Sequence, residues 1–101
     1  MIKHIVMWKM LDNTEVHGTK AVACAKGKAL LEGLLGIVPT ILKAEVGINL
    51  NTDPTSFDMV LYSEFSDWAA LEEYQEHPEH KKVAKFIGEI RSARSCVDYE
   101  V

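Results

Sequence analysis

The sequence predicts a single α+β domain in which a four-stranded antiparallel sheet packs against helices. Four segments have the composition or alternation of strands, and segments of helical periodicity separate the first from the second and the third from the fourth. A chain of 101 residues is long enough for one core and too short for two, so one domain over residues 1–101 is expected. The composition, 48% hydrophobic and 26% charged, is that of a folded protein rather than a disordered one.

The first strand is expected over residues 2–11, IKHIVMWKML, because this stretch is rich in β-branched and aromatic residues and short for a helix. Asp12 followed by Glu15 offers a capping box for the first helix. Gly36 and Pro39 are expected to end this helix. Its buried face is predicted to consist of residues at helical spacing, namely Ala23, Gly27, Leu30, Leu31 and Leu34.

Two further strands are expected in the middle of the chain, separated by a turn. Residues 41–50, ILKAEVGINL, alternate strictly between apolar and polar positions, which is typical of a half-buried strand. Residues 51–56, NTDPTS, have the composition of a turn. Residues 57–65, FDMVLYSEF, are predicted to form the third strand.

Two consecutive helical segments precede the last strand. Ser66 or Asp67 is expected to cap the first of them. Pro78 is favoured at the first position of the second, since its missing N–H would be unpaired there anyway, so His77 becomes the N-cap-like residue and His80 lies in the first turn. The apolar residues of the two segments are Leu71 and Tyr74, then Val83, Phe86, Ile87 and Ile90.

The resulting order, β-α-β-β-α-β, is the split arrangement of ferredoxin-like folds, with the first and third strands central. Both of these strands are apolar on two faces, whereas the second and fourth are apolar on one face only. In the closing strand Val97, Tyr99 and Val101 alternate with Cys96, Asp98 and Glu100. Asp98 and Glu100 are expected to point outward, because charge on an edge strand discourages unwanted strand pairing.

The apolar second face of the central strands predicts a homodimer. Two helices cover only one face of a four-stranded sheet, which leaves Ile5, Met7, Val60 and Tyr62 on the other. Leaving these side chains in water would forfeit roughly 6–12 kcal/mol, at about 1.5–3 kcal/mol each. Such patches mark interaction surfaces, and twofold packing of two sheets would cover this one. The alternative is a monomer whose own loops cover the second face, but the loops are short.

Charge and composition exclude several classes of partner. The net charge of −4 and the absence of a basic run argue against nucleic acid. No apolar run approaches the ~20 residues of a membrane span and no secretory signal is recognised, so a cytoplasmic protein is expected. Cys24 and Cys96 have no CxxC spacing, which argues against a disulfide framework or zinc site; both are interpreted as packing groups.

The stretch YQEHPEH, residues 74–80, carries the candidate chemistry. His77 precedes a proline, which disfavours a helical backbone, so the two imidazoles need not share a face and no metal site is predicted. The imidazole of His80 could accept and return a proton near neutral pH, and the hydroxyl of Tyr74 could stabilise an enolate. The alternative is a structural pair in which the two side chains bond to each other or to the backbone.

Six stretches together resemble the stress-responsive A/B barrel (Dabb) family of dimeric α/β-barrel proteins: MIKHIV, GIVPTI, AEVGIN, FDMVLYSEF, YQEHPEH and VDYEV. The resemblance covers essentially the whole chain and implies a homodimer with a pocket between helices and sheet in each subunit. Plant polyketide cyclases of this type perform cofactor-free aldol chemistry with a histidine and a tyrosine, which fall here on His80 and Tyr74. The first-strand histidine of that pocket falls on His4.

The remaining pocket residues are predicted from the strands: Val6 and Trp8 continue along the face of His4, and Leu61 belongs to the third strand. The sequence departs from the cyclases at Gly27 and Lys28, where aromatic pocket walls are expected, and at the bulky Trp8.

Three functions follow from this sequence. The first is a homodimeric Dabb protein that binds a small apolar or carbonyl-containing ligand. The second is a cofactor-free cyclase, lyase or isomerase with His80 as base and Tyr74 as donor. The third is a structural assembly subunit whose pocket Trp8 fills. None of the three calls for a cofactor or a metal.

Overall fold

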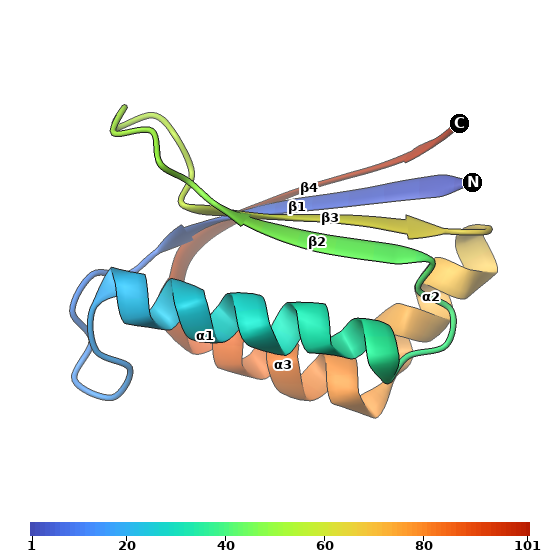
Figure 1. Ribbon diagram of the computed structural model, residues 1–101, viewed down its shortest axis with the longest axis horizontal. Coiled ribbons are helices and arrows are strands. Elements are labelled where there is room, and N and C mark those ends of the chain that lie inside the picture. Colours follow the sequence, from blue (N-terminus) through green and yellow to red (C-terminus); the bar gives the residue numbers. More distant parts are fainter.

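The computed structural model describes residues 1–101 as one sheet with helices on one side of it (Figure 1). The elements in chain order are β1 (Ile2–Met10), α1 (Lys20–Gly33), the 3-10 helix η1 (Leu34–Gly36), β2 (Lys43–Ile48), β3 (Met59–Phe65), α2 (Trp68–Glu76), α3 (Pro78–Ile90) and β4 (Arg91–Glu100). The predicted α+β class and the order of strands and helices are confirmed.

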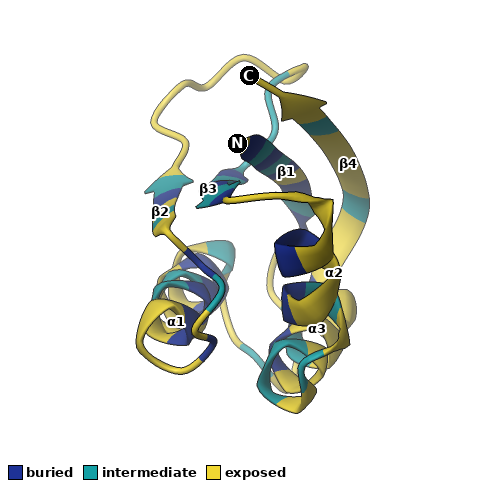
Figure 2. Ribbon diagram, turned by 90° about the vertical axis from the view of Figure 1, so that its right-hand side faces the viewer, coloured by how far each residue is buried: buried dark blue, intermediate teal, exposed yellow.

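The sheet has the order β2-β3-β1-β4 with every neighbouring pair antiparallel, so the first and third strands are central as predicted. The core lies between this sheet and the helices, where Figure 2 shows the buried residues. At one end of the core Ile2 and Phe65 pair across β1 and β3 and are fully buried. None of the helices combines the length and the apolar run that a membrane span requires.

The first helix starts later than predicted. The capping box expected at Asp12 and Glu15 is wrong, because α1 begins at Lys20 with Thr19 as its N-cap. The hydroxyl of Thr19 accepts a hydrogen bond from a backbone N–H of the first turn. Just before it the chain makes a turn at Gly18, whose φ of +76° favours glycine. Of the predicted buried face, Leu30 alone is exposed; Ala23, Gly27, Leu31 and Leu34 are buried.

Strands β2 and β3 are shorter than predicted because residues 49–58 between them form an irregular loop. The side-chain amide of Asn49 donates to the carbonyl oxygens of Asn51 and Phe57 and so closes this loop. Figure 1 shows it projecting beyond the face of the sheet that the helices leave open. We call it the overhanging loop; Leu50 at its start is 93% exposed.

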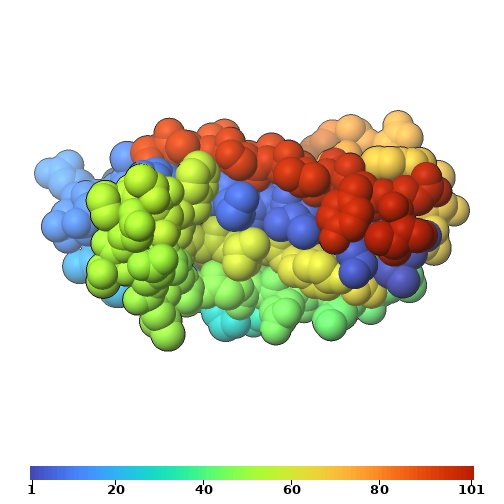
Figure 3. Space-filling view, turned by 90° about the horizontal axis from the view of Figure 1, so that it is seen from above, coloured from blue at the N-terminus to red at the C-terminus, as the bar shows by residue number.

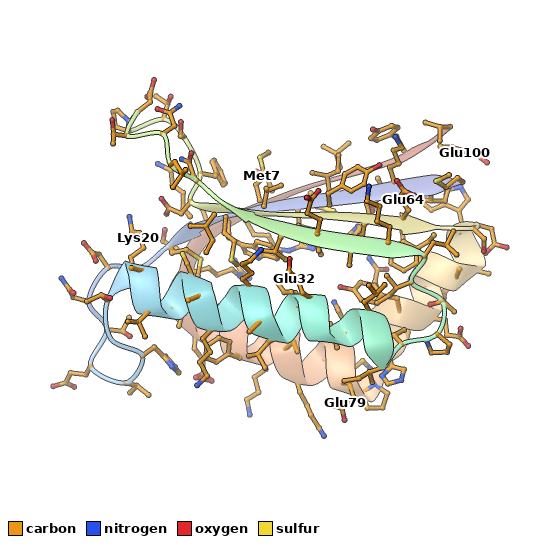
Figure 4. All side chains as sticks on the ribbon, in the orientation of Figure 1. Met7, Lys20, Glu32, Glu64, Glu79 and Glu100 are labelled. Carbon is orange, nitrogen blue, oxygen red and sulfur yellow. The ribbon has the colours of Figure 1, made fainter.

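The open face of the sheet carries apolar side chains, as predicted for the central strands, beside charged ones such as Glu64 (Figure 4). Met7 stands on this face, on the opposite side of the sheet from the helices (Figure 4). On β4 the same face carries Val97 and Tyr99, 54% and 40% exposed. Figure 3 shows that the overhanging loop occupies one end of this face only, and a cavity of about 500 Å³ lies between loop and sheet. The chain's own loops therefore do not cover this surface.

Candidate functional site

A second cavity, of about 120 Å³, lies on the other side of the sheet, toward the helices. Strands β1, β3 and β4 supply one wall, and helices α1, α2 and α3 supply the other. The structure brings all six candidate site residues together here: His4, Val6, Trp8, Leu61, Tyr74 and His80. Sequence reasoning missed the other lining residues, which are Leu31, Ala84, Ile87, Arg91 and Arg94.

The strand residues reach the cavity through alternation. His4, Val6 and Trp8 occupy every second position of β1, so all three face the helices and all three are buried. Leu61 on β3 pairs directly with Val6 and shares the same face. These strand side chains form the wall of the cavity on the sheet side, and Val6, Trp8 and Leu61 also belong to the packed core.

A break between two helices brings Tyr74 and His80 together. His77 ends α2 and caps α3 with an extended backbone, and Pro78 takes the first helical position, as predicted. The imidazole of His77 accepts a hydrogen bond from the backbone N–H of Glu79, at 3.1 Å. The turn at this break places the rings of Tyr74 and His80 with their centroids 4.4 Å apart. Regular helical spacing would not have produced this contact.

His80 is held as a neutral base. Its Nδ1 lies 3.1 Å from the carbonyl oxygen of Gln75, and since a carbonyl only accepts, we assign the proton to Nδ1 and the free lone pair to Nε2. Burial is the largest influence and lowers the pKa of His80 below its ordinary 6.5. The neighbouring imidazole of His4 and the charge of Arg94 lower this pKa further, while Gln75 and Glu76 raise it in part. The imidazole therefore stays unprotonated at neutral pH.

Tyr74 is a donor without a partner in the protein. The residue is only 2% exposed, and burial raises its pKa to about 12, so the hydroxyl keeps its proton. Its ring packs against those of Phe65 and His80, but its hydroxyl takes part in no hydrogen bond of the protein. His80 thus bonds to the backbone through Nδ1, whereas the hydroxyl of Tyr74 bonds neither to His80 nor to the backbone.

A second imidazole in the cavity has a carboxylate behind it. The Nδ1 of His4 donates to the carboxylate of Asp98, and the Sγ of Cys96 lies 3.8 Å from the same nitrogen. The expectation that Asp98 points outward is wrong, because the register sets it directly opposite His4 on the helix side. Val97 and Tyr99 take the outer side instead. Cys96 is likewise exposed beside this pair rather than packed.

His4, Cys96 and Asp98 form the one group whose ligand atoms lie close enough to share a metal ion, within 4.8 Å. Their chemistry fits a hydrogen-bonded cluster better. Nδ1 of His4 is already bonded to the carboxylate, and partial desolvation together with the charge of Asp98 raises the pKa of the Cys96 thiol, whereas metals bind the thiolate. His77 and His80 engage separate backbone groups, as described above.

The two arginines of the chain, Arg91 and Arg94, both line this cavity from β4. The alternation of the last strand could have found Arg94, since every second residue from Arg94 to Asp98 lies on the same side of the strand. It could not have found Arg91, which lies three residues before Arg94 and beyond a register shift. Neither arginine belongs to any ion pair of the protein.

Known proteins similar to this chain share its whole fold. A dimeric protein of unknown function and ferredoxin-like fold from Bacteroides fragilis is 36% identical, with a TM-score of 0.85 over 99% of this chain and 95% of that one. A dimeric ferredoxin-like protein from Thermobifida fusca is 19% identical, with a TM-score of 0.83 over 99% and 90%. The hydroxynitrile lyase of Passiflora edulis is 16% identical, with a TM-score of 0.83 over 99% and 92%. At 19% and 16% identity, the proteins from Thermobifida fusca and Passiflora edulis are similar to this chain in fold alone.

No match is found among curated proteins. The model of the family described as Stress responsive A/B Barrel Domain matches residues 2–101. Because this match spans nearly the whole chain, and the fold agrees with it, the protein belongs to the stress-responsive A/B barrel (Dabb) domain family.

Proposed function

We propose that this protein is a homodimer in which each protomer binds one small carbonyl-containing molecule in the cavity between helices and sheet. One observation carries the proposal: the hydroxyl of Tyr74, on a residue that is only 2% exposed, has no partner in the protein and lines the same small cavity as the free lone pair of His80. A tyrosine hydroxyl that no protein group accepts is available to donate to a ligand. A carbonyl oxygen of a ligand would accept this bond, and mostly apolar side chains would surround the rest of the molecule.

The homodimer is supported by the open face of the sheet. Its apolar side chains on β1, β3 and β4 remain in contact with water in the isolated chain, and the overhanging loop covers only one end of them. The similar proteins from Bacteroides fragilis and Thermobifida fusca are dimeric. Two copies related by a twofold axis would cover the open face of each with that of the other.

A second candidate function is cofactor-free proton transfer, which the lowered pKa of His80 favours. In this reaction Nε2 of His80 takes a proton from the carbon beside the carbonyl, and the C–H electron pair forms the enolate. The enolate oxygen accepts the hydrogen bond of Tyr74. Return of the proton from His80 to a different atom of the enolate completes an isomerisation. In an aldol closure the enolate carbon attacks a second carbonyl, and the resulting alkoxide takes the proton from His80. A hydroxynitrile lyase is among the proteins that share this fold.

Native mass spectrometry of the purified protein tests the proposal. A dimer with an added mass that disappears on denaturation is the expected result. A monomer would contradict the dimer, and a dimer that is empty and also fails to change its fluorescence with any small ketone would contradict the ligand site.

The proton-transfer candidate has its own test. In D₂O the protein should accelerate deuterium uptake at the carbon beside the ketone of 2-oxobutanamide, and His80→Gln should abolish the acceleration. Equal rates with protein and with buffer alone would exclude this reaction for small ketones.

A further inference from the structure

We propose that the ligand of this cavity is a short-chain oxo acid, and that the guanidinium of Arg94 binds its carboxylate. The inference rests on the proposed function, since it concerns the same cavity and names the class of molecule that it selects.

The first reason is the distribution of charge. The chain carries 15 acidic residues and a net charge of −4, yet both of its arginines line this one cavity. All six ion pairs of the protein are formed by lysine or histidine. Both arginines are exposed at the mouth of the cavity. A guanidinium presents its donors as a planar fork that matches a carboxylate, so an exposed arginine without an ion pair beside a cavity is suited to a carboxylate from outside.

The second reason is that two carboxylates close to the cavity residues already have other partners. Asp98, on the same side of β4, accepts the hydrogen bond of His4. Glu76, at the end of α2, pairs with Lys81 at 3.1 Å. Neither forms an ion pair with Arg94, whose neighbour on β4 is the thiol of Cys96, so an incoming anion would meet a cation without an ion-pair partner.

The third reason is position. Arg94 stands opposite Trp8 in the β1–β4 register, on the helix side of the sheet. Its charge lowers the pKa of both Tyr74 and His80, so the guanidinium acts on the same space as these two groups. Arg91 lies three residues earlier at the end of the strand, and its charge does not contribute at either group. We therefore assign the carboxylate to Arg94.

The size of the cavity limits the ligand. A volume of about 120 Å³ is well below the roughly 300–1,000 Å³ of pockets for drug-sized ligands, so the cavity favours a small molecule such as the four-carbon oxo acid 2-oxobutanoate. Its carboxylate would bind Arg94, its ketone oxygen would accept from Tyr74, and its methylene would face the free lone pair of His80. A larger ring system would have to displace side chains of the wall.

The test compares two probes of the same shape, 2-oxobutanoate and 2-oxobutanamide, which differ in charge. The chain has two tryptophans, and Trp68→Phe leaves Trp8 in the cavity wall as the sole reporter of binding by fluorescence. In this background the acid should bind about tenfold or more tightly than the amide, since hydrogen bonds between charged groups are the stronger ones. Arg94→Gln should bring the ratio close to one, and Arg94→Lys should restore part of it.

Lys85→Gln is the matched control, because it removes one positive charge from the exposed side of α3 and should leave the ratio unchanged. Equal binding of acid and amide, or an unchanged ratio in Arg94→Gln with a native melting curve, would overturn the assignment while leaving the cavity as a carbonyl site. If neither probe binds to the parent protein, the proposed function fails with it.

Discussion

His4 and Asp98 lie directly opposite each other on β1 and β4, and the carboxylate accepts the Nδ1–H of the imidazole on the helix side of the sheet. The two residues are 94 positions apart in the chain. The carboxylate fixes the tautomer of His4 and leaves Nε2 as the acceptor of its ring. The cavity thus contains two imidazoles, each with a fixed proton on Nδ1, one held by a side chain and one by the backbone.

Replacing the carboxylate of Asp98 should allow the His4 ring to adopt both neutral tautomers. In Asp98→Asn the side-chain shape is kept but the charged acceptor is lost, so the ¹⁵N chemical shifts of the His4 ring should move toward a mixture of tautomers. Affinity for the ligand should fall by about tenfold, the scale of one charge-assisted hydrogen bond. Glu100→Gln, which removes a charge from the same side of β4, is the control. Unchanged His4 shifts in Asp98→Asn would contradict the role of Asp98.

Removing the hydroxyl of Tyr74 should affect the ligand and not the fold. Tyr74→Phe deletes a group with no partner in the protein, so the free energy of unfolding should change by less than about 0.5 kcal/mol. Deuterium exchange into a ketone should fall by about 10²–10³-fold, the usual effect of losing one donor to an oxyanion. Tyr62→Phe is the control, because the hydroxyl of Tyr62 donates to Glu64 and lies on the open face. A loss of more than 1 kcal/mol in Tyr74→Phe would instead show a structural role, on the usual scale of a buried hydrogen bond.

Acid should destabilise the protein through His80. Its pKa is lowered in the folded state, so as the pH falls below the ordinary 6.5 the unfolded chain takes up a proton that the folded chain disfavours. The free energy of unfolding should therefore decrease below pH 6.5 until the pH reaches the folded-state pKa. Urea unfolding at a series of pH values measures this effect. His80→Gln should flatten the curve in that range. Any catalysed exchange should likewise persist below pH 6.5 before it declines.

Charge on the open face should separate the subunits of the proposed dimer. Val97→Asp places a carboxylate on the apolar side of β4, where burial against a partner would leave it unpaired. Sedimentation velocity should then show monomers at concentrations where the parent protein is dimeric. Val22→Asp makes the same change at a valine that is 58% exposed on α1 and should remain dimeric. If the Val97→Asp variant remains dimeric, the interface does not include this side of β4.

The sequence allowed the sheet to be predicted well because its central strands are apolar on both faces and its edge strands alternate. The beginning of α1 could not be predicted, since the turn at Gly18 and the cap at Thr19 compete with an equally good capping pattern at Asp12. Alternation also left open which side of β4 faces the helices. A charged residue on an edge strand looks solvated in a sequence, and only the register with His4 shows that Asp98 belongs to the cavity.

The polar pair of the cavity shows the same limit. Helical spacing does not determine how Tyr74 and His80 lie across a helix break, and resemblance to a family supplied what periodicity could not. The free state of the Tyr74 hydroxyl and the unpaired state of Arg94 depend on neighbours that come from distant segments. Neither the free hydroxyl of Tyr74 nor the unpaired state of Arg94 can be predicted from a local sequence pattern.

Strand β4 turns one row of side chains, with Arg94 and Asp98, toward the cavity and the other row, with Val97 and Tyr99, toward the open face. Ligand and second subunit would thus be bound by opposite sides of a single strand. Thermodynamic reciprocity then requires that any preference of the ligand for the paired protein equals the preference of the pair for the liganded protein. Dilution of the protein through the range where its subunits separate should therefore shift the apparent ligand affinity, and saturating ligand should shift the dissociation constant of the dimer by the same factor.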